Sequence, residues 1–510
     1  MCPDAFETDP APPELAEFRR AGALAIDAIA DYHASLDRRP VLPAVTPSAV
    51  AALFRDPLPE RGEAADELVA DWQRRVLPHL TAVGSPRHFA YVNGCGTLVG
   101  VLADALAGAT ATSSGAWRLG PAAVEIERQT IRWIARFVGY PESTGGLFVS
   151  GGTMANLTAL TSALRQIAPY DSTPLGLQDA HRQGRFLVYL SDHEGHVSVT
   201  RVADLMNLGR EAVRRVPSRA DYTIDPAALD RMLAADRRRG DRPFAVVAQL
   251  GSVNVGAVDP LDELAEVCAR HGVWLHGDGA CGLWLAGVPE TRAHFRGVER
   301  LDSVSVDAHK LLGVPYDCGL VMVRDAERLR RAFSLTAPYL GDGPAEVEAA
   351  ADFEIGPQMS RGFRALKVWM TMRRFGAEGL RRQFAHQVAL ARHLHRLVTD
   401  HPDFEVLHEP RLFLYCFRFA PHALEGRRGE PATEALLDRL NQEIADHLQR
   451  SGLALVMTSR LRGRVVLRFS ICSHRTREAD IERTFDALAR LGRSLVPIAL
   501  AELPESDRVA

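Results

Sequence analysis

The stretch Val304-Ser305-Val306-Asp307-Ala308-His309-Lys310 places a lysine directly after a short apolar strand. Lysine is seldom buried without a partner, so a lysine at the end of a buried strand is unusual. Partial desolvation would lower its pKa and provide the neutral amine that a Schiff base requires. The alternative is an ordinary strand-end lysine that is exposed to solvent.

The lysine content of the chain decides between these interpretations. Of the 60 basic residues in 510, only Lys310 and Lys367 are lysines. Arginine cannot replace a primary amine, because its guanidinium stays protonated. Lys367 lies in a predicted helix among basic and apolar residues, where we expect a surface lysine whose stem covers its apolar neighbours. Lys310 is therefore the candidate Schiff-base residue.

The overall composition excludes several classes of protein. With 46% hydrophobic and 24% charged residues and a net charge of −4, the chain is typical of a globular protein of two or three domains, and we expect neither nucleic acid nor membrane as a partner. Its start lacks the pattern of a signal peptide, and no apolar run approaches the roughly 18 residues of a membrane span. The scattered cysteines, without a CxxC pair, predict reduced thiols in a cytoplasmic protein.

Short apolar strands alternate with helical stretches from about residue 90 to 325. This pattern predicts an α/β fold with a mainly parallel sheet covered on both faces, in which ligands bind beyond the carboxyl ends of the strands. We expect an N-terminal helical segment at 1–82, a large α/β domain at 83–385 and a small α+β domain at 386–510. The predicted strands are Leu147–Val149, Phe186–Leu190, Phe244–Ala248, Val273–Leu275, Val304–Val306 and Cys318–Val323.

The turn Ser150-Gly151-Gly152-Thr153 follows the first strand and begins a helical run to about Ile167. Glycines let a ligand approach the backbone there, and a helix N-terminus presents free N–H groups to an anion. Thr153 could donate to a phosphate or simply cap the helix. The turn is neither a Walker A loop nor a GxGxxG fingerprint, which argues against an NTPase or a dinucleotide enzyme.

Two further strand ends carry polar side chains. His193 and His196 are three residues apart, whereas zinc-binding HExxH motifs place their histidines four apart on a helix. His196 could instead lie flat against an aromatic ligand. Asp278, between two glycines, could bind a metal, hydrogen-bond a ring nitrogen or cap a helix.

Together these strand ends suit pyridoxal phosphate. This cofactor needs an anion cradle, a carboxylate beside its protonated ring nitrogen, an imidazole that stacks on the ring and a Schiff-base lysine. A ligand-binding paralogue without activity is one competing interpretation. Another is a metal-dependent hydrolase, which leaves Lys310 unexplained and would use His193, Glu194, His196, His276 and Asp278.

The sequence also resembles the group II pyridoxal-phosphate-dependent amino-acid decarboxylases over nearly its whole length. This family includes aromatic-L-amino-acid, tyrosine, histidine and glutamate decarboxylases. The resemblance implies fold-type I architecture, similar to aspartate aminotransferase, and a homodimer whose N-terminal helices wrap the partner around a shared active site. The motifs that carry it are Glu17–Gly22, Ser85–Tyr91, Trp117, Pro121, Glu125–Glu127, Ser150–Thr153, Ser305–Lys310, Pro315–Cys318 and Val466–Cys472.

The resemblance also implies a role for individual residues. Lys310 would form the Schiff base, and Asp278 would pair with the ring nitrogen. His196 would stack on one face of the ring and Ala280 would pack near it. Ser252 stands where the aromatic decarboxylases usually have threonine. The implied cofactor-binding residues are Gly152, Thr153, His196, Ser252, Asp278, Ala280, Asp307, His309 and Lys310.

Tyr339 matches the mobile-loop tyrosine of the family and would protonate the substrate carbon after CO2 leaves. Lys310, His196 and Tyr339 are thus the implied catalytic residues. Related aldehyde synthases often carry phenylalanine at the tyrosine position, and a phenyl ring cannot act as a general acid. Tyr339 therefore favours an amine product. An aldehyde synthase and a lyase acting on a phosphorylated amine are the alternatives within the cofactor class.

The substrate is less clearly indicated. Tyr91-Val92-Asn93-Gly94 stands where aromatic decarboxylases tend to have Phe-Pro after the tyrosine, so Tyr91 and Asn93 would give a smaller, more polar substrate wall. Leu311 stands where many relatives have tryptophan. We narrowly favour an aromatic L-amino acid, followed by acidic, aliphatic or basic amino acids.

Overall fold

The computed structural model describes residues 13–168, 171–172, 176–177, 184–335 and 352–501. The described helices are α1 (Pro13–Ser35), α2 (Pro47–Leu53), α3 (Ala65–Asp71), α4 (Leu98–Thr110), α5 (Pro121–Val138), α6 (Gly152–Ile167), α8 (Val197–Leu205), α9 (Pro226–Arg238), α10 (Leu261–His271), α11 (Ala326–Phe333), α13 (Ala365–Asp400), α14 (Pro431–Arg450) and α15 (Glu478–Ala501). The described strands are β1 (Gly145–Val149), β2 (Phe186–Ser191), β3 (Val213–Val216), β4 (Arg242–Gln249), β5 (Trp274–Asp278), β6 (Ser303–Asp307), β7 (Gly319–Val323), β8 (Phe404–Val406), β9 (Leu414–Phe419), β10 (Met457–Leu461) and β11 (Arg464–Ser470).

The larger sheet has seven strands in the order β1-β7-β6-β5-β4-β2-β3. Its strands run parallel except β7, which is antiparallel to both neighbours, β1 and β6. The prediction of an α/β fold with a mainly parallel sheet is confirmed, and all six predicted strands occur. The seventh strand, β3, was not predicted, because two arginines interrupt its apolar pattern, Val213-Arg214-Arg215-Val216.

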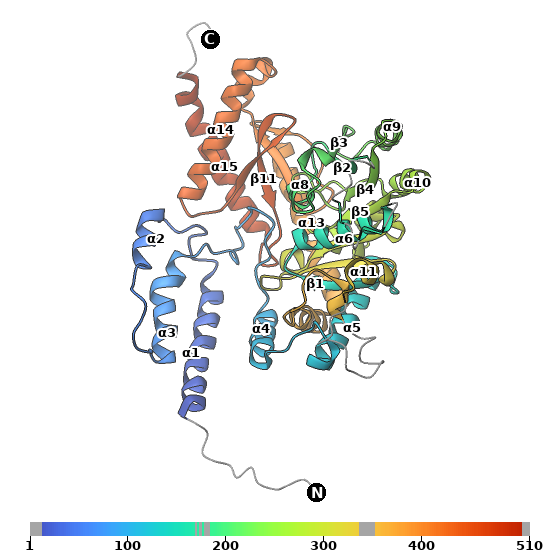
Figure 1. The fold of residues 1–510 in the computed structure, drawn as a ribbon. Coiled ribbons are helices and arrows are strands. Elements are labelled where there is room, and N and C mark those ends of the chain that lie inside the picture. The colour runs from blue at the N-terminus through green and yellow to red at the C-terminus, as the bar shows by residue number, and fades with distance from the viewer. Residues whose placement is uncertain (1–12, 169–170, 173–175, 178–183, 336–351, 502–510) are drawn as a thin grey trace.

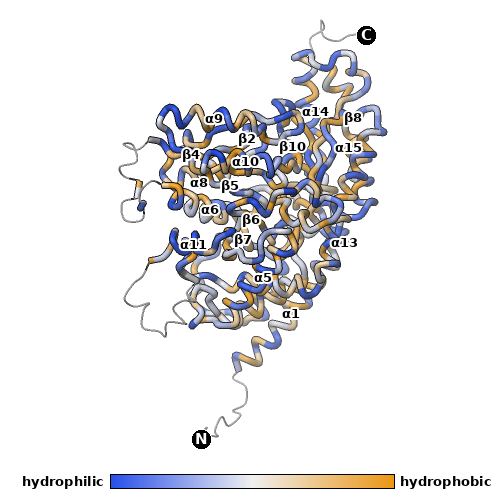
Figure 2. The backbone as a smooth tube through the Cα atoms, turned by 90° about the vertical axis from the view of Figure 1, so that its right-hand side faces the viewer, coloured by the Kyte–Doolittle hydropathy of each residue, from blue (hydrophilic) through white to orange (hydrophobic). Residues whose placement is uncertain are grey.

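Helices cover both faces of this sheet, as the uniformly apolar strands predict. Successive residues of β4 point to opposite faces: Val246 and Ala248 join the core beneath α5, α9, α10 and α13, whereas Ala245 and Val247 join the core beneath α6, α8 and α11. The hydrophilic residues of α9 and α11 lie on the outside of the molecule (Figure 2). The carboxyl ends of the parallel strands therefore meet at one edge of a sheet that is buried on both faces.

The second sheet has four antiparallel strands in the order β10-β11-β9-β8, packed with α14 and α15 (Figure 1). This is the arrangement expected of a small α+β domain. α13 crosses the predicted boundary at residue 385 as one helical run with a kink at Gly376. The same helix thus belongs to both predicted domains, whose exact limits remain predictions.

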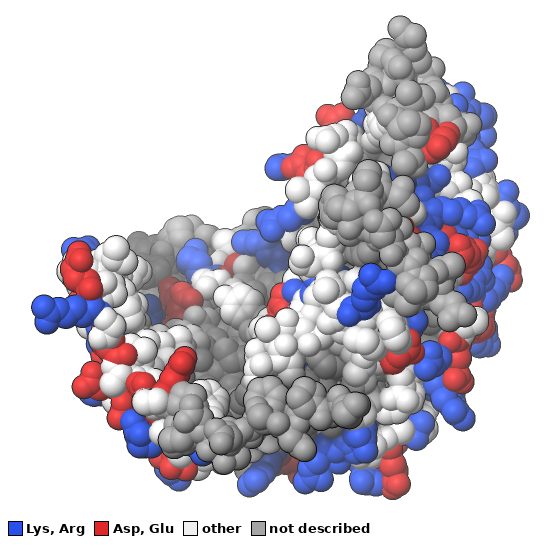
Figure 3. All heavy atoms as spheres, turned by 60° about the horizontal axis from the view of Figure 1, so that its bottom comes forward, with Lys and Arg blue, Asp and Glu red and all other residues white. Residues whose placement is uncertain are grey.

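The N-terminal helices form an arm, which we define as α1 to α3. α1 and α3 pack on each other and stand apart from the larger sheet (Figure 1). A hollow separates the arm from the rest of the molecule, and acidic and basic side chains are interspersed on the face that Figure 3 shows. Phe18 of α1 is 68% exposed, so this arm leaves apolar surface without a covering element in the described chain.

Of the helices described, none combines the length and apolar character that crossing a bilayer requires.

Lys367 lies inside the protein, where the N-terminal part of α13 packs against α4. Its Nζ lies 2.9 Å from Asp104 Oδ1 and donates to the carbonyl oxygen of Pro315 at 3.2 Å. The prediction of a surface lysine is therefore wrong. The apolar neighbours that suggested a covering stem instead bury the whole side chain, and Asp104 supplies the opposite charge that burial requires.

Candidate active site

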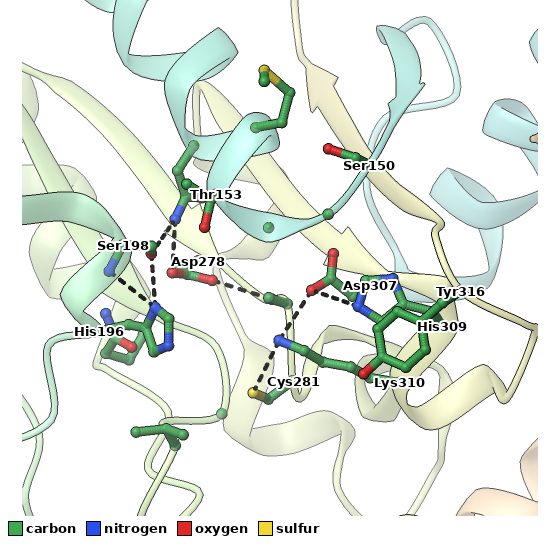
Figure 4. Close-up of a pocket in the computed structure, with 18 residues that line it drawn as sticks. Ser150, Thr153, His196, Ser198, Asp278, Cys281, Asp307, His309, Lys310 and Tyr316 are labelled. Atoms are coloured by element: carbon green, nitrogen blue, oxygen red, sulfur yellow. Dashed lines mark hydrogen bonds and ion pairs between the residues drawn. The ribbon is translucent and has the colours of Figure 1, made fainter. Parts of the chain in front are cut away.

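A cavity of about 340 Å³ opens where β1, β4, β5 and β6 end. It lies at the carboxyl edge of the parallel strands, where ligands collect in such sheets. Every predicted cofactor-binding residue except Ser252 lines it. Figure 4 shows Lys310 reaching into the cavity between Asp307 and Cys281, with Asp278 and His196 on the opposite side.

Lys310 follows β6 in a tight turn, Ala308–Leu312, whose backbone departs from helical geometry at the lysine itself. Its Nζ lies 3.0 Å from Asp307 Oδ2 and 3.8 Å from Cys281 Sγ. Burial alone would favour the neutral amine, but the acidic groups of Cys281 and Asp307 outweigh it and raise the pKa of Lys310 above its ordinary value. The predicted lowering of this pKa is therefore wrong, because the ion pair outweighs desolvation.

One end of the cavity is an anion cradle formed by the N-terminus of α6. The helix begins at Gly152, its N-cap residue is Gly151, and no side chain caps it in the described structure. Thr153 thus does not cap the helix; it is exposed and lines the cavity. A Cβ atom at Gly152 would lie 3.2 Å from Asp307 Oδ2, so a side chain there would crowd the cavity.

His309 completes this end of the cavity. Its Nδ1 accepts the backbone N–H of Cys318 at 3.1 Å, and burial lowers its pKa, so the neutral ring carries its hydrogen on Nε2. The ring lies against the glycine turn, because a Cβ atom at Gly151 would be 3.3 Å from His309 Cε1. Backbone N–H groups and the Thr153 hydroxyl therefore border the place where a phosphate would bind, and His309 Nε2, 3.6 Å from Asp307 Oδ2, lines the same cavity.

Asp278 lies at the end of β5 and is almost fully buried. Its Oδ2 accepts from Asn156 Nδ2 at 3.0 Å, and its Oδ1 accepts from the Ala280 N–H at 3.2 Å and the Ser305 hydroxyl at 3.3 Å. Burial opposes ionisation, but the electrostatic influence of His196 and the hydrogen bond from Asn156 lower the pKa of Asp278 below its ordinary value. Asp278 is thus an ionised carboxylate that can pair with a protonated ring nitrogen.

His196 precedes α8 on the same side of the cavity. Its Nδ1 lies 2.7 Å from Ser198 Oγ and accepts the Ser198 backbone N–H at 3.2 Å. Burial lowers the pKa of His196, which favours the neutral ring. A neutral imidazole held at one nitrogen and open to the cavity suits stacking on an aromatic ring.

Two predicted residues differ in position from the rest. Ser252 is buried outside the cavity lining, and its Oγ accepts the backbone N–H of Ala257 at 2.9 Å. Its neighbours Gly251 and Val253 line the cavity instead. Tyr339 lies outside the described residues, so its role stays a prediction.

A second cavity of about 330 Å³ contains the predicted substrate residues Tyr91 and Asn93. It shares Lys310, among other residues, with the first cavity, so the two adjoin at the lysine. Asn93 Oδ1 accepts the hydroxyl of Tyr316 at 2.6 Å. The backbone of Tyr91 has φ 53°, a left-handed conformation that non-glycine residues seldom adopt and that clusters at functional sites.

Arg468 lines the second cavity and was not predicted. It lies on β11 and is almost fully buried; its Nε donates to the Val253 carbonyl at 2.7 Å, and its Nη2 is buried without a hydrogen-bond partner in the described chain. A charged residue in the apolar segment Val465–Ile471 was the signal that could have revealed it, since arginine is rarely buried unpaired. Cys281 and Asn156 were missed as well, because neither residue type is distinctive in sequence.

The residues considered for a metal-dependent hydrolase do not gather around one point. Glu194 accepts from the backbone N–H groups of Asn254 and Val255, and His193 is exposed beside Asp192. Within the described ranges, no three His, Cys, Asp or Glu side chains are grouped as a metal site would require. The groups that do converge are those that pyridoxal phosphate needs: a helix N-terminus for its phosphate, a carboxylate for its ring nitrogen and a lysine amine.

Comparison with known proteins identifies the family. The pyridoxal-dependent decarboxylase conserved domain matches residues 47–420. An aromatic-L-amino-acid decarboxylase of Bacillus atrophaeus is 34% identical, covering 90% of this chain and 92% of its own, and a phenylacetaldehyde synthase of Arabidopsis thaliana is 28% identical, covering 93% and 95%. A crystal structure of Oryza sativa TDC with PLP and tryptamine is 29% identical with a TM-score of 0.87, covering 96% of this chain and 99% of that one. The chain therefore belongs to the pyridoxal-dependent amino-acid decarboxylases, whose cofactor is pyridoxal phosphate.

Proposed function

We propose that this enzyme decarboxylates an aromatic L-amino acid to the corresponding amine. The observation that carries the proposal is the position of Lys310 Nζ, between an anion cradle and an ionised carboxylate and at the junction with a second cavity. The choice of an aromatic substrate is supported by the relatives, which include an aromatic-L-amino-acid decarboxylase and a TDC structure with tryptamine. Pyridoxal phosphate, when bound, supplies the electron sink for the bond that breaks.

Seven residues of the first cavity have a proposed task. Lys310 would hold the cofactor through its amine, while Gly152, Thr153 and His309 would hold the phosphate through N–H and O–H donors. Asp278 keeps the ring nitrogen protonated, which strengthens the electron sink. The neutral ring of His196 and the methyl group of Ala280 bracket the flat ring and exclude water from it.

The second cavity is the proposed substrate side. The unpartnered Nη2 of Arg468 binds a substrate carboxylate, because a buried guanidinium without a hydrogen-bond partner is costly until an anion completes it. Tyr91, which is exposed in the cavity, offers an aromatic face for the substrate side chain. Asn93 is anchored through Tyr316 and lines the wall beside it.

Tyr339 decides the proposed product. After the bond between Cα and the carboxylate breaks and CO2 leaves, the phenol gives its proton to Cα, and the product is an amine. The phenylacetaldehyde synthase among the relatives keeps an aldehyde product open as the second candidate. We expect Tyr339→Phe to raise aldehyde and peroxide relative to amine, as measured by product mass and a peroxide assay. An unchanged product ratio would contradict this role for Tyr339.

A homodimer in the cytoplasm is part of the proposal. Leu98, Leu102 and Leu106, spaced four residues apart, form a half-exposed apolar stripe on α4, and the arm of α1 to α3 exposes further apolar side chains. A second copy of the chain would cover both surfaces. The described cysteines, six in number, are all unpaired, which is expected in a reducing compartment. Sedimentation of the holoenzyme at about twice 55.9 kDa would support the dimer.

The substrate is tested by incubating the purified holoenzyme with pooled L-amino acids and finding by mass which one loses CO2. We expect tryptamine, tyramine or phenethylamine to accumulate. Loss of CO2 from an acidic, aliphatic or basic amino acid alone would overturn the aromatic substrate but keep the decarboxylase. Lys310→Ala is the matched control, because no amine should form without the Schiff base.

A further inference from the structure

A continuous chain of hydrogen bonds runs behind the cavity and passes through one buried amide, that of Asn156. Asn156 lies on α6 and joins His276 and Asp278, both on β5, to Ser198 at the start of α8. Its partners come from residues 42 to 122 positions away, so only the folded protein brings them together. The members are almost fully buried, apart from the half-buried His196, and are Trp274, Ser303, His276, Asn156, Asp278, Ser198 and His196.

The direction of each hydrogen bond follows from Asp278. An ionised carboxylate can only accept, so the end of Asn156 that faces Asp278 Oδ2 at 3.0 Å is its NH2 group. The amide oxygen therefore faces His276 Nε2 at 3.0 Å, and this nitrogen must carry the imidazole hydrogen. Burial lowers the pKa of His276 to about 4, so the ring is neutral and its other nitrogen can only accept.

The hydrogen bonds at the other end of this network, at Ser303 and Trp274, supply the donor that His276 Nδ1 needs. His276 Nδ1 lies 2.8 Å from Ser303 Oγ; because this nitrogen can only accept, the Ser303 hydroxyl donates to it, while the same oxygen accepts the Trp274 indole N–H at 2.8 Å. The indole can only donate. The hydrogen bonds at Ser303 and Trp274 are therefore compatible with the orientation that Asp278 imposes on the Asn156 amide.

The second N–H of Asn156 donates to Ser198 Oγ at 3.1 Å, and this hydroxyl lies 2.7 Å from His196 Nδ1 (Figure 4). Because Nδ1 also accepts the Ser198 backbone N–H, the Ser198 hydroxyl donates to it. The Asn156 amide thus contacts Asp278 directly and His196 through the Ser198 hydroxyl.

We propose that Asn156 is a positioning residue, which keeps Asp278 aimed at the cofactor ring nitrogen and His196 in its stacking tautomer, and whose own orientation is set by His276, Ser303 and Trp274. The inference rests on the proposed pairing of Asp278 with the ring nitrogen. Asp278 also faces the charged or titratable groups of His196, His276 and Lys310, so the Asn156 donor acts alongside these groups.

The test compares two cofactors that differ at the ring nitrogen. Pyridoxal phosphate and its 1-deaza analogue, in which C–H replaces this nitrogen, are titrated into the apoenzyme, and the ratio of their dissociation constants measures the preference for the nitrogen. We expect Asn156→Leu to reduce this preference by about 10-fold or more, because a hydrogen bond to a charged group is lost. Ser303→Ala should reduce it by about threefold or more, although Ser303 does not line the cavity, because His276 then loses the donor that fixes its tautomer.

Three further variants keep the test decisive. Ser162→Ala is the matched control, since Ser162 is buried on the same helix and its hydroxyl, among the described residues, donates only to the Thr158 carbonyl at 3.0 Å; it should leave the preference unchanged. Asn156→Asp retains the shape if the leucine variant does not fold, and should lower the preference at a pH where both carboxyl groups are ionised, because an ionised carboxylate cannot donate to Asp278. Asp278→Asn should abolish the preference.

The outcomes separate the two proposals. If Asp278→Asn keeps the preference for the ring nitrogen, the proposed placement of the cofactor fails. If Asp278→Asn abolishes the preference while Asn156→Leu, Asn156→Asp and Ser303→Ala all keep it, the cofactor placement stands and the positioning role of Asn156 is overturned.

Discussion

Lys310 and Lys367 are both paired with a carboxylate, Lys310 Nζ with Asp307 at 3.0 Å and Lys367 Nζ with Asp104 at 2.9 Å. Their surroundings differ. The Lys367 side chain is 6% exposed and also donates to a backbone carbonyl, whereas the Lys310 side chain is 18% exposed and borders two cavities. The lysine assigned to chemistry is thus the less buried of the two. Access to a shaped cavity, and not depth of burial, distinguishes the proposed Schiff-base lysine from Lys367.

The largest expected effect separates the two lysines directly. Lys310→Ala should abolish turnover and the borohydride-reducible link to the cofactor, because no other described amine lies in the cavity. Lys367→Ala should keep both. The measurement is the mass of the borohydride-treated protein together with amine production. A labelled Lys310→Ala protein would refute the assignment of the Schiff base.

His276 is a buried titratable side chain that, unlike Lys310 and Lys367, carries no charge. Its pKa is lowered from 6.5 to about 4 in the folded protein, so the unfolded chain binds a proton in this window that the folded chain does not. Stability should therefore fall as pH decreases from 6.5 to 4, by about 3 kcal/mol from this histidine alone. Urea unfolding of wild type and His276→Gln at pH 7 and pH 4.5 checks this. Equal losses in both proteins would contradict it.

A smaller effect on stability tests the structural role of Lys367. Asp104→Asn leaves the Lys367 ammonium buried beside a single carbonyl and should lower the free energy of unfolding by about 1–2 kcal/mol, less than for a fully buried pair because Asp104 is partly exposed. Cofactor binding should not change. A variant as stable as wild type in denaturant titration would show that the pair contributes nothing.

The smallest expected effect is on the pKa of Lys310, which the neighbouring Asp307 carboxylate raises. Asp307→Asn removes a carboxylate that raises the pKa of Lys310, so the pKa should fall and the amine should lose its proton at lower pH. The rate at which the apoenzyme forms its Schiff base with pyridoxal phosphate, followed by absorbance against pH, should shift its midpoint downward. A midpoint that moves upward would contradict the ion-pair explanation.

Much of the fold and most of the candidate site could be predicted because their signals are local. Six strands were found from apolar runs, and Asp278, His196 and Lys310 were found because each follows such a run. Asn156 and Cys281 could not be found in this way. Their importance comes from neighbours such as His276, 120 residues from Asn156, and no local pattern encodes those contacts.

The sequence by itself determined the order of the strands along the chain, the residues that reach the carboxyl edge of the sheet, and the scarcity of amines that made Lys310 the candidate. These properties depend on side-chain type and spacing within a few residues. The tertiary structure alone decided that β7 runs antiparallel, that Lys367 is buried against Asp104, and that Lys310 is held as an ammonium by its acidic neighbours. It also decided that Arg468 lines the second cavity and that its buried Nη2 has no hydrogen-bond partner in the described chain. The physical reason is that burial and charge pairing depend on what packs around a residue, and those neighbours come from distant parts of the chain.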